Sequence, residues 1–217
     1  MLKKLIRLKA ETKINLFLLI IFTVGVFGLW YPDTRALFIS LMPYTLLLSM
    51  VLMFWMHRAW KPRHIIIFAI IALLGYFVEV LGVATGIVFG EYFYGQGLGF
   101  QLWGTPPMIG LNWLMLVYCA YVLFRKKGLH PVIQIVLASA LLVAYDVLME
   151  PVAIKLGMWG WPPIDVVPLQ NYIAWFVISF VMLSLMHLFS LRFRNGVAPA
   201  LFFIQMGFFA ALNLLLS

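Results

Sequence analysis

Residues 65–88 read IIIFAIIALLGYFVEVLGVATGIV, a run of 24 residues in which Glu79 is the only charged side chain. About 20 apolar residues are enough to cross the hydrocarbon core of a bilayer as a helix. The rest of the chain has the same character, because 65% of its 217 residues are hydrophobic and 10% are charged. A soluble domain carries about 25% charged residues. The sequence therefore predicts a membrane protein.

Seven apolar stretches follow one another without a long polar linker. They predict an all-α, polytopic membrane protein with seven transmembrane helices in a single integral membrane domain, residues 1–217. The expected spans are residues 14–30, 36–56, 65–88, 107–124, 131–154, 171–190 and 197–216. No small-residue cleavage site follows the first stretch, so we expect it to be retained as a span and not removed as a secretory signal.

The basic residues fall on alternate connections. Thirteen of the 15 Lys and Arg residues precede the first span or follow the second, fourth and sixth, and only Arg35 and Lys155 lie on the opposite side. The positive-inside rule then places the N-terminus in the cytoplasm and predicts a multi-pass protein of the cell (inner) membrane. This placement explains the net charge of +8 without a nucleic-acid partner. The oligomeric state is left open.

Most of the acidic residues gather around the third and fifth spans. They are Glu79, Glu91, Asp146, Glu150 and Asp165. An ionisable group inside a span is costly and usually faces a partner or a cavity. Glu79 and Asp146 lie about 14 and 15 residues into their spans, in the half of the membrane away from the N-terminus. Asp146 and Glu150 are four residues apart and share a helical face, and we expect Pro151 to weaken the helix there.

Two parts of the chain repeat weakly. The matching positions are Glu79 and Asp146, Tyr92 and Trp159, Tyr94 and Trp161, Pro106 and Pro168, and Trp113 and Trp175. Spans three and four, and spans five and six, are therefore interpreted as two copies of one unit. Two copies in the same orientation are related by an axis along the membrane normal.

The loops after spans three and five combine glycines with aromatic residues. The rings are Tyr92, Tyr94, Trp103, Trp159 and Trp161. Trp and Tyr commonly form a belt at the membrane interface, and each ring alone has that explanation. Beside acids, however, such rings could line a cavity, where their electron-rich faces stabilise a cation. A carboxylic acid in an apolar pocket keeps its proton near neutral pH and can act as a general acid. The combination predicts a site that protonates an alkene.

The stretches EVLGVATGIVFGEYFY at 79–94, YDVLMEP at 145–151 and GMWGW at 157–161 resemble a family of membrane carotenoid biosynthesis proteins. These are the multi-span carotenoid 1,2-hydratases, with the archaeal bisanhydrobacterioruberin hydratases as relatives. The resemblance covers about residues 65–190. It implies that water adds across the terminal isopropylidene double bond of an acyclic, lipid-soluble carotenoid. Protonation gives a tertiary carbocation, water captures it, and no cofactor is needed.

Within this hypothesis, Asp146 is the first choice for the proton donor because it lies deeper in the membrane than Glu150. Glu150 or Glu79 then keeps the proton in place or orients water. The candidate substrate-binding residues are Tyr92, Tyr94, Trp103, Asn112, Trp113, Trp159, Trp161 and Asn171. Asn112 and Asn171 either hydrogen-bond water or the carboxyls, or join helices to one another. No metal-ligand spacing is present, and no metal site is expected.

Other interpretations stay open. A carotene end-ring cyclase also begins with alkene protonation, and composition does not separate it from a hydratase. A small transporter needs a water-filled route across the membrane. The inner halves of spans three and five are apolar, which argues against such a route. A retinal-binding photoreceptor, by contrast, is excluded, because it needs a lysine inside a span and the stretch 197–216 has none. In a non-catalytic assembly protein, the buried acids would pair with Lys155 or with each other.

Overall fold

The computed structural model describes residues 2–125, 128–163 and 166–216, and seven α-helices make up most of this part of the chain. The helices are α1 (Leu2–Trp30), α2 (Pro32–Trp55), α3 (Pro62–Thr85), α4 (Met108–Phe124), α5 (Pro131–Lys155), α6 (Leu169–Leu188) and α7 (Val197–Leu215). The loops contain the short strands β1 (Phe93–Tyr94) and β2 (Trp159–Gly160) and the 3₁₀ helix η1 (Gln96–Leu98). The all-α prediction is confirmed.

Proline and glycine set several helix boundaries. Helices α2, α3 and α5 begin at Pro32, Pro62 and Pro131, where the missing N–H would have had no partner within the helix. Helix α3 ends three residues before the expected limit because Gly86 adopts a left-handed conformation, with φ of 65°, and caps it. Helix α1 begins well before the expected span, and α5 continues without interruption through Pro151.

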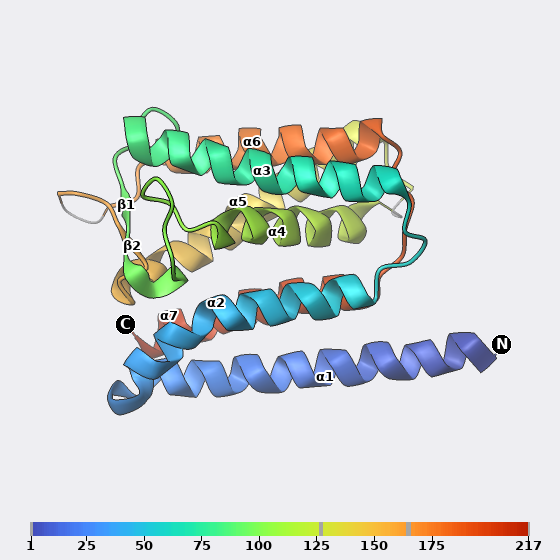
Figure 1. Ribbon diagram of the computed structural model, residues 1–217, viewed down its shortest axis with the longest axis horizontal. Coiled ribbons are helices and arrows are strands. Elements are labelled where there is room, and N and C mark those ends of the chain that lie inside the picture. Colours follow the sequence, from blue (N-terminus) through green and yellow to red (C-terminus); the bar gives the residue numbers. More distant parts are fainter. Residues whose placement is uncertain (1, 126–127, 164–165, 217) are drawn as a thin grey trace.

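The helices alternate in direction, so the N- and C-termini lie at opposite ends of the bundle (Figure 1). Helices α3 and α6 lie along one side, and α1 and α2 lie along the other (Figure 1). Helix α4 is central and contacts α2, α3, α5, α6 and α7. This arrangement agrees with an odd number of membrane crossings.

Six helices, α1, α2, α3, α5, α6 and α7, are long and apolar enough to cross a membrane. Helix α4 agrees with the expected span within one residue, but at 17 residues it is the shortest of the seven and falls below the about 20 residues that usually cross a bilayer. Twelve of these residues are buried. Because protein rather than lipid surrounds α4, its length does not have to match the thickness of the hydrocarbon. The chain is therefore a multi-pass membrane protein with an enclosed central helix.

Helices α3 and α4 approach each other closely at two glycines. A Cβ atom added at Gly75 would lie 2.6 Å from Cβ of Trp113, and one added at Gly110 would lie 2.5 Å from the backbone oxygen of Ala72. Small residues at such contacts let helix backbones pack closely in membranes. This contact holds Trp113 against α3, the helix that carries Glu79.

Replacing Gly110 with alanine is expected to destabilise the bundle. The added methyl group must displace the Ala72 carbonyl or the Tyr76 side chain, and such overpacking costs about 1–3 kcal/mol. The measurement is the thermal unfolding midpoint of the purified protein in detergent. Gly207→Ala is the matched control, because nothing lies within 4 Å of a Cβ added there. Equal midpoints for the two variants would show that the close approach of α3 and α4 has no energetic weight.

Candidate active site

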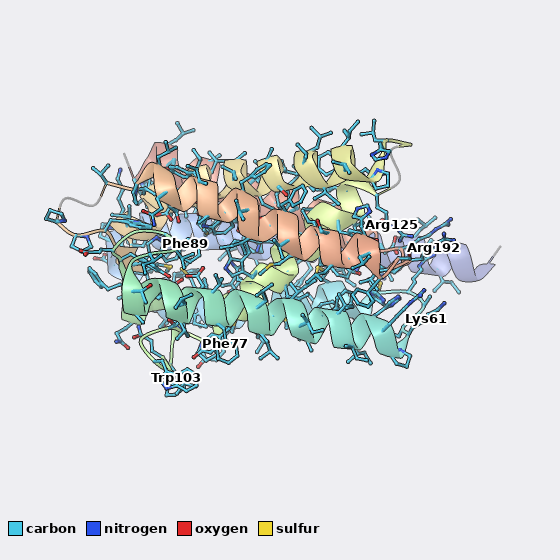
Figure 2. The ribbon with its side chains drawn as sticks, turned by 90° about the horizontal axis from the view of Figure 1, so that it is seen from above. Lys61, Phe77, Phe89, Trp103, Arg125 and Arg192 are labelled. Carbon is cyan, nitrogen blue, oxygen red and sulfur yellow. The ribbon has the colours of Figure 1, made fainter. Side chains whose placement is uncertain are left out.

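A cavity, called here the carboxyl cavity, lies between the helices at the end of the bundle opposite to the N-terminus. Its walls include Glu79, Glu150, Asn171, Trp175, Tyr92, Tyr94, Trp159 and Trp161. Phe89, another wall residue, marks this end in Figure 2, whereas Lys61, Arg125 and Arg192 mark the other end. Acids and rings that were selected from separate parts of the sequence therefore meet in one place.

Glu79 is buried, and its carboxylate accepts three hydrogen bonds. The hydroxyls of Tyr92 and Tyr94 donate to Oε2 over 2.6 and 2.7 Å, and Nε1 of Trp113 donates to Oε1 over 2.8 Å. Burial raises the pKa of both tyrosine hydroxyls, and the neighbouring Glu79 charge adds to the effect. Both hydroxyls therefore keep their protons and act as donors. Three donors suit an ionised carboxylate, which can only accept.

Glu150 is also buried, at 3% exposed, but only one of its oxygens is engaged. Its Oε2 accepts hydrogen bonds from Nε1 of Trp159 over 2.9 Å and from Nε1 of Trp161 over 3.0 Å. Among the described residues, Oε1 has no hydrogen-bond partner. Glu150 is thus the cavity carboxyl that has an oxygen left for a bound molecule.

Asp146 lies one helical turn before Glu150 on α5, behind the cavity wall. It is fully buried, and its Oδ2 accepts a hydrogen bond of 2.7 Å from Nδ2 of Asn171, which does line the cavity. Its Oδ1 has no partner within the described part of the chain. Asp146, Glu150 and Glu79 are close enough to interact electrostatically. Three neighbouring carboxyls cannot all be ionised cheaply in an apolar interior, so at least one carries a proton.

The two aromatic loops meet as a small antiparallel sheet, in which β1 pairs with β2. The ring pairs are Tyr94 with Trp159, Tyr92 with Trp161 and Trp113 with Trp175, at centroid distances of 6.0, 5.2 and 4.2 Å. In the loops, the first ring of one copy thus faces the second ring of the other copy, as a two-fold axis between the copies requires. The repeat predicted from the sequence therefore builds one site from both copies.

The cavity is small, with a volume of about 20 Å³. A buried water molecule needs at least about 10–15 Å³ and two or more polar partners. Glu150 and Asn171 provide polar groups in the wall. The space therefore fits one water molecule, and it is too small for a branched hydrocarbon end.

An apolar cavity of about 40 Å³ adjoins the first and shares Ile109, Met149 and Trp159 with it as walls. Residues of α2, α4, α5 and α7 line it, and four of its wall residues are methionines, whose flexible side chains adapt to irregular shapes. Asn112 lies in its wall, 8% exposed, and its Oδ1 has no partner among the described residues. An apolar compartment, with an open acceptor on Asn112, thus lies beside a water-sized polar one.

Trp103 was expected among the substrate-binding residues, and the structure brings it to neither cavity. Its side chain is 63% exposed and lies near Phe77 and Tyr76 on the outer surface (Figure 2). The tight turn between Leu102 and Thr105, in which Trp103 has a φ of 54°, places it there. Trp103 therefore occupies the position of an interfacial belt residue.

The remaining acidic and basic candidates lie outside the site. Glu91 is exposed, and Asp165 is not among the described residues. Lys155 is exposed, and its Nζ donates to the backbone oxygen of Leu216 over 2.7 Å, so it does not neutralise the buried acids. Within the described ranges, no group of three His, Cys, Asp or Glu side chains is arranged to hold a metal ion.

Four further residues line the carboxyl cavity and were not predicted from the sequence: Phe89, Ile109, Met149 and Trp175. Trp175 had a usable signal, because it repeats the position of Trp113 in the second copy. Phe89, Ile109 and Met149 are apolar residues in an apolar chain, and no pattern distinguishes them from lipid-facing neighbours.

Two comparisons with known proteins found similar sequences. Residues 40–215 match the model of a family described as carotenoid biosynthesis protein. A bisanhydrobacterioruberin hydratase from Haloarcula japonica is 30% identical over 112 residues, which cover 48% of this chain and 38% of that protein. This chain thus spans well under two thirds of that relative's length. No solved structure matches the chain significantly. Because the family match covers most of its length, the chain belongs to the carotenoid biosynthesis protein family.

Proposed function

We propose that this protein adds water across the terminal isopropylidene double bond of an acyclic carotenoid end. One observation carries the proposal: a water-sized cavity walled by two carboxyls and several aromatic rings adjoins an apolar cavity. The family and the hydratase relative support a carotenoid as the substrate. The apolar cavity would take the hydrocarbon end, after its methionine side chains adjust, while water occupies the polar one.

Glu150 is the proposed proton donor, in place of the deeper Asp146. It lines the cavity, and its Oε1 is free, whereas Asp146 lies behind the wall. The carboxyl proton of Glu150 adds to the less substituted alkene carbon, and the π electrons form the new C–H bond. The neighbouring carbon becomes a tertiary cation. The indole N–H groups of Trp159 and Trp161 stabilise the resulting carboxylate.

The cation forms at the boundary between the two cavities, where Trp159 lines both. The rings of Tyr92, Tyr94 and Trp161 and the carboxylate of Glu79 line the polar side of this boundary. A cation over a desolvated ring is stabilised by about 2 kcal/mol or more. The negative charge on Glu79, held by three donors, adds attraction without becoming a competing nucleophile, since its oxygens are already engaged.

Water then completes the reaction. It attacks the cation and forms a C–O bond, and the extra proton passes to the Glu150 carboxylate. The product is a tertiary alcohol, and Glu150 regains its starting state. Asp146 acts through Asn171, which reaches from Asp146 to the cavity wall and so orients the water. Water capture is favoured over ring closure by the water-sized compartment next to the acid, and cyclisation is the alternative outcome.

Glu150→Gln is expected to lower hydration about 100-fold or more, because general acid catalysis contributes roughly that factor. The measurement is mass analysis of pigments from cells that make an acyclic carotene and express the protein. Hydration adds the mass of one water per modified end, whereas cyclisation leaves the mass unchanged. Glu91→Gln is the control, since Glu91 is an exposed glutamate outside the site. An active Glu150→Gln variant would remove Glu150 as the donor, and a product of unchanged mass would indicate a cyclase.

Asp146→Asn tests the positioning role. An asparagine oxygen at this position can still accept the hydrogen bond from Asn171, so the fold is expected to persist. Activity should fall less than in Glu150→Gln, and the pH dependence of hydration in isolated membranes should change, because one carboxyl of an interacting group is gone. A pH profile identical to that of the unmodified protein, at full activity, would exclude Asp146 from the mechanism.

Ala153→Leu tests the place of the hydrocarbon chain. Ala153 is 2% exposed and lines the apolar cavity, so a larger side chain fills that space. We expect a higher KM for the carotenoid with a much smaller change in kcat. Ala144→Leu, at an exposed position on the same helix, is the control. An unchanged KM in Ala153→Leu would place the hydrocarbon elsewhere.

A further inference from the structure

Four arginines line one hollow at the end of the bundle opposite to the carboxyl cavity. The hollow has a volume of about 430 Å³, and its walls are Arg58, Arg125, Arg192 and Arg194, with Ala59 and Phe193. They come from the α2–α3 connection, the end of α4 and the α6–α7 connection. Figure 2 shows Arg125 and Arg192 at this end. Three connections that are distant in sequence thus bring their charges together.

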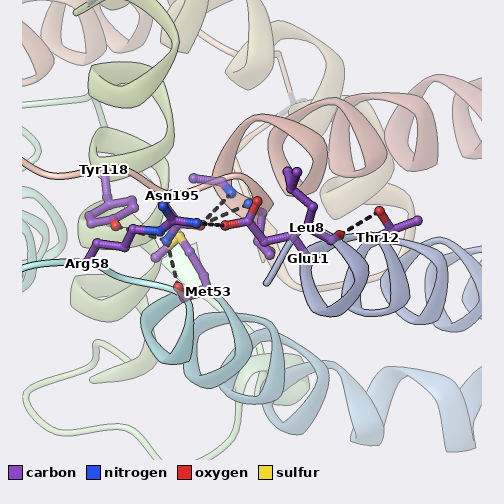
Figure 3. A network of polar contacts seen from close by, with 9 residues as sticks. Leu8, Glu11, Thr12, Met53, Arg58, Tyr118 and Asn195 are labelled. Atoms are coloured by element: carbon purple, nitrogen blue, oxygen red, sulfur yellow. Dashed lines mark hydrogen bonds and ion pairs between the residues drawn. The ribbon is translucent and has the colours of Figure 1, made fainter. Parts of the chain in front are cut away.

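Two of these arginines have only partial compensation within the protein. Arg58 forms an ion pair of 3.3 Å from Nη2 to Oε1 of Glu11 (Figure 3), but its Nε is buried without a partner among the described residues. Arg125 donates to the backbone oxygen of Phe193 over 3.4 Å, and its guanidinium carbon lies 5.6 Å from the centre of the Tyr121 ring. Neither contact of Arg125 supplies a negative charge.

The other two arginines are available to a ligand. Arg192 and Arg194 are exposed, and in the part of the chain that the structure describes neither has a hydrogen bond or an ion pair. Of the described acidic residues, only Glu11 lies at this end. Four guanidinium groups therefore share one carboxylate, and a bound anion would relieve their mutual repulsion.

The guanidinium groups of the hollow favour a phosphate group as the ligand. A guanidinium group offers paired N–H donors that match the oxygens of a phosphate, and a cluster of them binds it in several ways at once. The chain shortly before Arg192 is apolar and exposed, since Leu188 and Phe189 at the end of α6 are 76% and 46% exposed. Basic pockets on the cytoplasmic side of membrane helices bind anionic lipid headgroups. The positive-inside rule assigns this end to that side.

We propose that the arginine hollow binds the phosphate headgroup of an anionic phospholipid, whose acyl chains lie against the exposed apolar end of α6. The site lies at the other end of the bundle from the carboxyl cavity and does not depend on the proposed reaction. Binding would tie the α2–α3 and α6–α7 connections to the end of α4 and stabilise the bundle.

The test is thermal unfolding of the purified protein in detergent, titrated with phosphatidylglycerol, phosphatidylcholine or inorganic phosphate. Phosphatidylglycerol should raise the unfolding midpoint in a saturable manner, and the other two should not. In the double variant R192Q/R194Q, the affinity for phosphatidylglycerol should fall about 30-fold, since each basic residue near an anionic lipid contributes roughly five-fold. Its midpoint without lipid should stay the same, because both side chains are exposed.

The matched control is K61Q/R63Q, which removes two exposed cations at the same end but outside the hollow. It should keep most of the affinity for phosphatidylglycerol. An equal loss in the two double variants would mean diffuse attraction and would overturn the site. An unchanged affinity in R192Q/R194Q would overturn it as well. A midpoint shift with inorganic phosphate equal to that with phosphatidylglycerol would replace the lipid by a soluble phosphate ligand.

Discussion

Carboxyl groups buried in a membrane bundle need hydrogen-bond donors, and this requirement determines how the loops pack at the end of the bundle that holds the carboxyl cavity. Glu79 receives two phenol hydroxyls and an indole N–H, and Glu150 receives two indole N–H groups. Tyr and Trp meet two demands at once, because each combines a donor with a large apolar body. The loops between the helices are therefore folded inward over the acids. The same rings that satisfy the carboxyls become the walls of the cavity.

The internal repeat supplies two similar halves, and the proposed chemistry depends on the differences between them. In the first half Glu79 is saturated with donors, and the position four residues later is Val83. In the second half Asp146 is followed at the same spacing by Glu150, which keeps one oxygen free. The fold brings the two halves to one small space, which Glu79 and Glu150 line together. Neither half contains such a site alone.

The sequence was sufficient for the helices and for the meeting of acids with aromatic loops. The length of the apolar runs, which is a local property, determines the helices, and the internal repeat indicates that the two loops belong to one site. The sequence did not predict which side chains form hydrogen bonds with one another. Counting spacings aligns the indoles with Asp146, yet they bind Glu150, because the fold of a loop decides which turn of the helix its side chains reach. Trp103 looked like its neighbours in composition, and one tight turn carries it to the surface.

In the proposed hydration, water in the carboxyl cavity becomes the hydroxyl group of the product. Cells or membranes that contain the protein and an acyclic carotene can be incubated in water enriched in oxygen-18, and the hydroxylated pigment can be analysed by mass spectrometry. The new hydroxyl is expected to carry oxygen-18 at the enrichment of the solvent. A hydroxylated product that contains oxygen-16 alone, or a modified carotene without added oxygen, would contradict the proposed hydration.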